Sequence, residues 1–384
     1  MKHKTLSALG AAAAAVAAFF AASTGAHAAT FSTIHVYNGT DGRGPNELIE
    51  NAGYYYGTSS AGGAYLDNGA ILKISKTTGA VTVLYSFNGT TGSRPYGALV
   101  RNADGTFYGT ASTAGTYNGG VAFKMTAAGA VTFIHQFGAA GEGSLPTSLA
   151  LGNDGNLYGT TTYGGANGKG TLFKMTTAGV VTTLHSFNGT DGSNPQGQLI
   201  STGNGVYYGT AFGGGAGDCG TYYKITNAGT FTLLYTFPKA APAGCQPQGR
   251  LNSATDGRMW GTTQMGGASN AGTVFALSTA GVPTWVYSFT GGADGRWPHG
   301  GVTQANNFAF YGTTGYGSTY GLGTTFKITL SGVFTTLHAF DPAMTGETTA
   351  PHQPLLLDSS GNLIGSTPGY SQSTNGGSSF RQTP

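Results

Sequence analysis

The sequence predicts an all-β fold, a seven-bladed β-propeller built from four-stranded repeats of about 50 residues. Two observations support this prediction. A short motif, an aromatic residue followed by Gly-Thr, recurs at a nearly constant interval along the chain. The two ends of the chain also hold complementary parts of the repeat, so that together they complete one unit.

The repeat is marked most clearly by the glycine of the aromatic-Gly-Thr motif. This glycine occurs at Gly57, Gly109, Gly159, Gly209, Gly261 and Gly312, with a diverged copy at Gly365. Successive copies are 50 to 53 residues apart. A regular period of this length indicates a repeat architecture.

Each repeat contains four short segments that are typical of β-strands. In the copy around Asp154 they are residues 148–152 (strand a), 157–161 (strand b), 171–175 (strand c) and 181–187 (strand d). They are rich in β-branched and aromatic residues and are bounded by Gly, Asn or Asp. Four-stranded units in series predict propeller blades arranged around a central channel.

The chain termini favour a closed ring. Residues 31–37 match strand d with no other strand before them, whereas residues 355–384 match strands a, b and c. The first strand is therefore predicted to complete the last blade, which removes the exposed strand edge of a linear stack. An open β-solenoid is the alternative, but it gives no reason for complementary ends.

The N-terminus predicts export. Lys2 and Lys4 precede an apolar run over residues 6–22, and Ala26-His27-Ala28 resembles a cleavage site. This pattern predicts a secretory signal peptide over residues 1–28, followed by a single propeller domain over residues 29–384. The apolar run is short for a membrane span. We expect a secreted or periplasmic monomer without a transmembrane segment.

The composition limits the classes of partner. Charged residues make up only 8% of the chain, and the net charge is +3. No basic patch is apparent, which argues against nucleic acid as a partner.

The two cysteines are predicted to form a disulfide. Cys219 lies in a b–c loop and Cys245 in the next d–a loop, and both kinds of loop emerge on the same face of an antiparallel blade. An oxidising compartment favours the bond, which would stabilise the fold by about 3–4 kcal/mol in the chain-entropy model. Two independent free thiols are the alternative.

A candidate ligand site is predicted on the face that carries the long b–c and d–a loops, because binding residues tend to lie on loops held by a rigid scaffold. A proline precedes strand a in each repeat, at Pro45, Pro95, Pro146, Pro195, Pro247, Pro298 and Pro354. Residues near these prolines are expected to rim the channel: Asn46, Arg94, Tyr96, Gln196, Gln248, Arg296, Trp297 and His299. Their side chains suit sugar hydroxyls or a peptide. The alternative is that they only cap strands and loops.

No catalytic residue, metal site or cofactor is predicted. His35, His135, His185 and His338 share one strand-d position that tyrosine fills in other repeats, which favours packing over metal binding. Five acidic residues in the long loops could in principle supply an acid–base pair, although no spacing favours any two of them. These are Asp67, Glu142, Asp218, Asp294 and Glu347.

The pattern YGTT–GG–GTxFKMT–GxxTxLHSF recurs with substitutions through the chain. The pattern resembles the GloVer-type tandem repeat of exported bacterial choice-of-anchor proteins, over essentially all of the chain after the leader. The resemblance implies a propeller-like exported protein with no established activity and supplies no catalytic residues. The C-terminal anchor of that family has no counterpart in the sequence, so we expect no surface anchor.

The predicted function is therefore a non-enzymatic binding module that recognises an extracellular glycan or protein through its long-loop face. Two alternatives stay open. One is a propeller hydrolase or lyase that acts on polysaccharide, and the other is a structural protein of the cell envelope.

Overall fold

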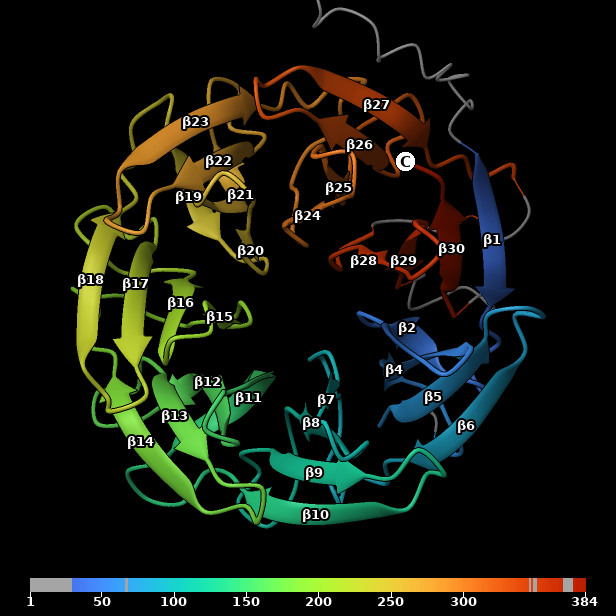
Figure 1. Ribbon diagram of the computed structural model, residues 1–384, viewed down its shortest axis with the longest axis vertical. Coiled ribbons are helices and arrows are strands. Elements are labelled where there is room, and N and C mark those ends of the chain that lie inside the picture. Colours follow the sequence, from blue (N-terminus) through green and yellow to red (C-terminus); the bar gives the residue numbers. More distant parts are fainter. Residues whose placement is uncertain (1–29, 66–67, 345–346, 348–350, 369–375) are drawn as a thin grey trace, which may run out of the picture.

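A computed structural model describes residues 30–384 except 66–67, 345–346, 348–350 and 369–375. The described residues form seven antiparallel sheets, which are arranged in a ring around a central axis, as Figure 1 shows. Five sheets have four strands, and in the other two the innermost strand is divided into two short pieces. The predicted seven-bladed propeller is confirmed.

The first four blades run from the inner to the outer strand in chain order. Blade 1 contains β2 (Arg43–Pro45), β3 (Ile49–Asn51), β4 (Tyr54–Ala61), β5 (Ala70–Ser75) and β6 (Val81–Ser86). Blade 2 contains β7 (Val100–Arg101), β8 (Phe107–Ala111), β9 (Val121–Met125) and β10 (Val131–Gln136). Blade 3 contains β11 (Gly143–Leu151), β12 (Leu157–Gly164), β13 (Thr171–Met175) and β14 (Val181–Ser186). Blade 4 contains β15 (Ile200–Ser201), β16 (Val206–Ala211), β17 (Thr221–Thr226) and β18 (Phe231–Thr236).

The last three blades follow the same pattern, except that the seventh takes its outer strand from the start of the chain. Blade 5 contains β19 (Gly244–Pro247), β20 (Asn252–Ser253), β21 (Met259–Gly266), β22 (Thr273–Leu277) and β23 (Pro283–Ser288). Blade 6 contains β24 (Val302–Gln304), β25 (Phe310–Thr314), β26 (Thr324–Ile328) and β27 (Phe334–Ala339). Blade 7 contains β28 (Leu356–Leu357), β29 (Leu363–Thr367), β30 (Ser378–Gln382) and β1 (Phe31–Val36).

The ring closes through the pairing of β1 with β30. The two strands run antiparallel, with Phe31 opposite Gln382 and Val36 opposite Ser378. In Figure 1 the blue β1 lies outside the dark red β30, beside the first blade. The predicted completion of the last blade by the first strand is therefore confirmed.

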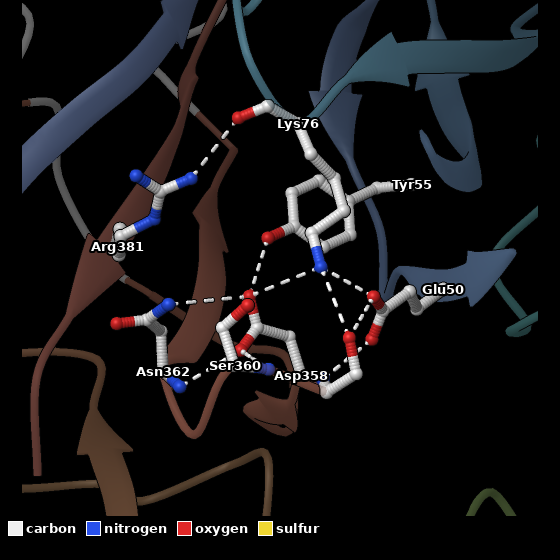
Figure 2. A network of polar contacts seen from close by, with 8 residues as sticks. Glu50, Tyr55, Lys76, Asp358, Ser360, Asn362 and Arg381 are labelled. Carbon is white, nitrogen blue, oxygen red and sulfur yellow. Dashed lines mark hydrogen bonds and ion pairs between the residues drawn. The ribbon is translucent and has the colours of Figure 1, made fainter. Parts of the chain in front are cut away.

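A polar network reinforces the junction between blades 7 and 1 (Figure 2). Lys76 forms ion pairs with Glu50 of its own blade and with Asp358 of blade 7, at 3.6 Å for the second pair. The hydroxyl of Tyr55 donates to Asp358 at 2.8 Å. Arg381 donates to the backbone carbonyl of Lys76 at 3.2 Å. Asp358 is buried, so the contacts with Lys76 and Tyr55 stabilise its carboxylate. The network also links residues near the two ends of the chain.

The aromatic-Gly-Thr motif explains how each blade packs internally. A Cβ added at Gly109 would lie 2.6 Å from the Phe123 ring, and one added at Gly159 would lie 2.5 Å from the Phe173 ring. Both distances are too short for a side chain at the glycine. The glycine of strand b therefore leaves room for the aromatic ring of strand c, whose full burial contributes about 1.5–3 kcal/mol.

Neighbouring blades pack through a repeated contact between aromatic rings. At six of the seven blade interfaces, a phenylalanine just after strand d meets the strand-c aromatic residue of the next blade, with ring centroids 5.1 to 5.6 Å apart. The pairs are Phe87–Phe123, Phe137–Phe173, Phe187–Tyr223, Phe237–Phe275, Phe289–Phe326 and Phe340–Phe380. Such tilted and edge-on pairs stabilise beyond the area they bury. The recurring aromatic positions of the sequence thus form the interfaces between the blades.

Candidate functional site

One end of the channel opens into a cavity of about 460 Å³. Every blade contributes to its lining the residue that follows the loop proline. These residues are Asn46, Tyr96, Thr147, Gln196, Gln248, His299 and His352. The site therefore collects one side chain from each repeat, although these residues are far apart in the sequence.

Five of the eight residues predicted to bind a ligand line this cavity. They are Asn46, Tyr96, Gln196, Gln248 and His299. The other three, Arg94, Arg296 and Trp297, lie outside its lining. The Trp297 ring packs edge-on against Tyr316 at 5.2 Å between centroids, and the Arg296 guanidinium lies over the Trp297 ring at 4.9 Å.

The backbone at Arg94 and Trp297 shows what these residues do locally. Both have a left-handed backbone, with φ of 53° and 57°, a conformation that is uncommon for residues other than glycine. Their amides donate to the b–c loop of the preceding blade, to the carbonyls of Asn68 and Ala271, each at 2.9 Å. These residues fix the turn that leads into the proline and the inner strand.

The seventh repeat requires a correction. Pro354 was predicted to be its loop proline, but Pro351 occupies that place. The Thr313 hydroxyl donates to the carbonyl of Pro351 at 3.3 Å, just as Thr262 donates to Pro298 at 3.1 Å. His352 is therefore the rim residue of blade 7, and the sequence analysis missed it. The spacing to the apolar residue of strand a, four positions after the proline in several repeats, could have revealed it.

A chain of hydrogen bonds orders three rim side chains. Gln248 Nε2 donates to Gln196 Oε1 at 2.8 Å. His299 Nδ1 lies 2.8 Å from Gln248 Oε1, and because an amide oxygen can only accept, the proton is on Nδ1. This tautomer leaves a lone pair on His299 Nε2, which is buried and has no partner among the described residues.

His352 packs beside His299, with ring centroids 4.4 Å apart. Its Nε2 is also buried without a partner in the described part of the chain. Burial and the neighbouring His352 lower the pKa of His299 to about 3. Burial lowers the pKa of His352 to about 4. Both imidazoles are therefore neutral near neutral pH and can act only as polar, uncharged groups.

An ion pair that the sequence analysis did not predict crosses the channel. Arg250 Nη1 of blade 5 lies 2.9 Å from Glu47 Oε1 of blade 1. Two blades separate them on the shorter way round the ring, so the pair spans the opening. Burial raises the pKa of Glu47, while the charge of Arg250 opposes that shift. Each residue directly precedes a leucine that lies between the two pieces of the inner strand of its blade, and this shared position was the available clue.

Asn46 has a structural role within the rim. It is only 2% exposed, and its Nδ2 donates to the Thr58 hydroxyl at 2.9 Å. Gln353 Nε2 donates to Asn46 Oδ1 at 3.3 Å, which links blade 7 to blade 1. Tyr96, by contrast, is 49% exposed. The rim thus combines buried amides that link neighbouring blades with exposed side chains that can contact a ligand.

The outer-strand histidines each lie beside a carboxylate of the loop that follows. The pairs are His35–Asp41, His135–Glu142, His185–Asp191 and His338–Glu347, with N–O distances of 2.8 to 3.0 Å. Among the described residues, no group of three or more His, Cys, Asp or Glu side chains is arranged to hold a metal ion. Contacts with loops and neighbouring rings account for these histidines.

Four of the five long-loop acids considered as acid–base candidates contact a group of their own loop or of the outer strand that precedes it. Glu142 and Glu347 contact histidines. Asp218 accepts from the amide of Gly214 at 2.7 Å, and Asp294 accepts from the Tyr287 hydroxyl at 3.0 Å. None of the four lines the cavity. Asp67 lies outside the described residues.

The predicted disulfide between Cys219 and Cys245 is present, with the Cα atoms 4.5 Å apart. It ties the b–c loop of blade 4 to β19, directly before the rim residue Gln248. A structural disulfide is typical of an extracellular or periplasmic protein. In the part of the chain that the structure describes, no helix is long and apolar enough to cross a membrane.

Comparison with known families agrees with this architecture. The model of the Gloeobacter/Verrucomicrobia repeat matches residues 18–166, 100–309 and 145–380. The chain belongs to this family. The sequence has no significant match among curated proteins.

Solved structures share the propeller fold at low sequence identity. Virginiamycin B lyase from Staphylococcus aureus is 14% identical with a TM-score of 0.62, and the match covers 92% of this chain and all of the lyase. The extracellular domain of a putative hybrid two-component system from B. thetaiotaomicron is 11% identical with a TM-score of 0.60 over 91% of this chain and 39% of that one. A putative 6-phosphogluconolactonase from Bacteroides uniformis is 13% identical with a TM-score of 0.52 over 76% of this chain and 83% of that one. At such identities the likeness shows the fold alone.

Proposed function

We propose that this protein is an exported binding module that holds a saccharide in the cavity at the channel mouth and does not transform it. The observation that carries the proposal is the chemistry of the lining. Carboxamides, hydroxyls and two open tyrosines face a cavity of about 460 Å³, a volume within the usual range for small-ligand sites.

The carboxamides suit the hydroxyls of a sugar. Gln196, Gln198, Gln248 and Gln353 all line the cavity. Each carboxamide can both donate and accept, and so can each sugar hydroxyl. The Gln196–Gln248–His299 chain of hydrogen bonds holds part of this set in place before a ligand arrives, which lowers the entropy cost of binding.

Exposed tyrosines on the same face offer apolar ring surface to the C–H faces of a sugar. Tyr96 and Tyr163 line the cavity and are 49% and 48% exposed. Three more tyrosines, in the b–c loops, are about half exposed: Tyr65, Tyr117 and Tyr320. Tyrosine presents an apolar body with a polar tip, so these rings extend the site toward a longer chain of sugar units.

The carboxylates favour binding over hydrolysis. Glycoside hydrolases of the usual kind use two carboxylic groups that flank the scissile bond. Among the described lining residues Glu47 is the only acid, and Arg250 already holds it. The proposal therefore places a polysaccharide hydrolase or lyase second and a structural envelope protein third.

Export rests on two features of the chain. The proposed signal peptide, residues 1–28, lies outside the described residues, and its sequence carries the pattern of a secretory leader. The Cys219–Cys245 disulfide fits an oxidising compartment. We propose that the protein reaches the periplasm or the medium and meets its saccharide there.

A glycan array tests this function directly. The chain beginning at Thr30 is applied to the array, and each binder is then titrated by calorimetry with analysis of reducing ends. Saturable binding without new reducing ends is the expected result. Release of reducing ends would establish a hydrolase or lyase instead. Failure to bind any saccharide would favour the structural role.

A further inference from the structure

The described lining of the cavity holds a single pair of charges. Among its described lining residues, only Glu47 and Arg250 are charged near neutral pH, since both lining histidines have a lowered pKa and stay neutral. The remaining titratable residues of the lining are Tyr96 and Tyr163. Any charged ligand therefore meets an acid and a base that at present neutralise each other.

Arg250 has unused capacity to bind an anion. A guanidinium carries five N–H donors in a planar fork, yet its contact with Glu47 is the only side-chain interaction found for it within the described residues. The contact joins a single nitrogen to a single oxygen. A quarter of the Arg250 side chain, 25%, is exposed, and Arg250 is part of the cavity lining.

Glu47 is less accessible than Arg250, and its carboxylate is suited to protonation. Its side chain is 8% exposed, and burial raises its pKa. If another anion bound the guanidinium in place of Glu47, Glu47 would become a buried charge without a partner, which is strongly unfavourable. Taking one proton from solvent avoids that cost and leaves the total charge of the cavity unchanged.

We propose that the ligand of the channel mouth is an acidic saccharide, whose carboxylate binds Arg250 in place of Glu47 while Glu47 takes up one proton. This inference deepens the proposed saccharide-binding function and rests on it. The exchange forms and breaks no covalent bond. Bidentate pairing between Arg250 and the ligand carboxylate then replaces the single contact with Glu47.

The test uses oligogalacturonate and its methyl ester, which share one carbohydrate skeleton and differ in charge. The free acid should bind at least about tenfold more tightly than the ester at pH 5, and its affinity should fall by up to about tenfold per pH unit once Glu47 ionises. Calorimetry in two buffers of different ionisation enthalpy should show uptake of about one proton per bound carboxylate.

Two variants make the test specific. Glu47→Gln should abolish the proton uptake and the pH dependence and keep the preference for the acid. Arg250→Gln should abolish the difference between acid and ester. Thermal melting of each variant checks that the ring is intact. Equal affinity for acid and ester in the wild-type chain would overturn this inference and leave saccharide binding in place. Binding of no saccharide at all would overturn both.

Discussion

Phe31 of β1 stacks on His338 of β27, with ring centroids 3.8 Å apart and ring planes 7° apart. The same Phe31 ring lies 5.1 Å from the ring of Phe380 in β30. The first strand therefore contacts blade 6 through its side chain while its backbone completes blade 7. Ring closure depends on packing between blades as well as on the strand ladder.

Phe31→Ala should lower the free energy of unfolding by about 2 kcal/mol, because a large part of the ring is buried between two blades. Val36→Ala in the same strand is the matched control, since Val36 is 38% exposed and a surface substitution changes stability by about 0.5 kcal/mol or less. Denaturant titration measures both. Deleting residues 31–36 should destroy the cooperative transition, and a deleted chain that melts like the parent would refute closure by this strand.

Tyr223→Phe should raise stability by about 1 kcal/mol. The Tyr223 hydroxyl is fully buried and has no partner among the described residues. The same place is filled by phenylalanine in five other blades: Phe123, Phe173, Phe275, Phe326 and Phe380. Tyr158→Phe should lower the stability, because the Tyr158 hydroxyl donates to Asp154 at 2.8 Å. If both variants were more stable than the parent, or both less stable, this account of the two hydroxyl groups would be wrong.

Stability should fall as the pH drops from about 6.5 toward 4. The folded pKa values of His299 and His352 are about 3 and about 4, below the ordinary value of 6.5. In this window the unfolded chain binds more protons than the folded chain, so acid favours unfolding. Each imidazole contributes on the order of 2 kcal/mol across the window.

The double variant His299→Gln with His352→Gln should show a flatter pH profile of the unfolding free energy than the parent. The acids Asp154, Asp256 and Asp358 act in a lower range, because their pKa values lie below 3.8 in the folded chain. Their contribution is present above that pH and is lost as the pH falls below it. Parallel profiles of parent and variant between pH 4.5 and 6.5 would show that the imidazoles do not titrate as described.

Tyr96→Ala should weaken saccharide binding by about tenfold, through loss of ring contact worth on the order of 1 kcal/mol. Its melting temperature should barely change, because the side chain is 49% exposed. Trp297→Ala is the control, since Trp297 lies outside the cavity lining and packs on Tyr316. That variant should lose stability and keep its affinity. If Trp297→Ala lost affinity and Tyr96→Ala kept it, the ligand would bind beside Trp297 and not in the cavity.

The fold could be predicted from the sequence because each blade is specified locally. Gly109, for example, is required by Phe123 of the same blade, and this requirement recurs in every repeat where an aromatic ring occupies strand c. The first and last strands could be matched because both are incomplete copies of one pattern. The disulfide followed from the two loops lying on the same face.

The site could be predicted only in part, because ring closure assembles it from distant repeats. The position after the loop proline identified Asn46, Tyr96, Gln196, Gln248 and His299. Glu47 and Arg250 share only a position before a leucine in the local sequence, and they meet only across the channel. His352 was missed because Pro354 obscured the equivalence of Pro351 with the other loop prolines.

The most direct measurement of the central claim is a crystal structure of the chain beginning at Thr30, soaked with the saccharide that binds best on the array. The account predicts difference density in the channel-mouth cavity, within hydrogen-bonding distance of Gln196 or Gln248 and against the Tyr96 ring. Density for the saccharide on the outer strands or on the face of the short turns, with the cavity empty at saturation, would contradict it.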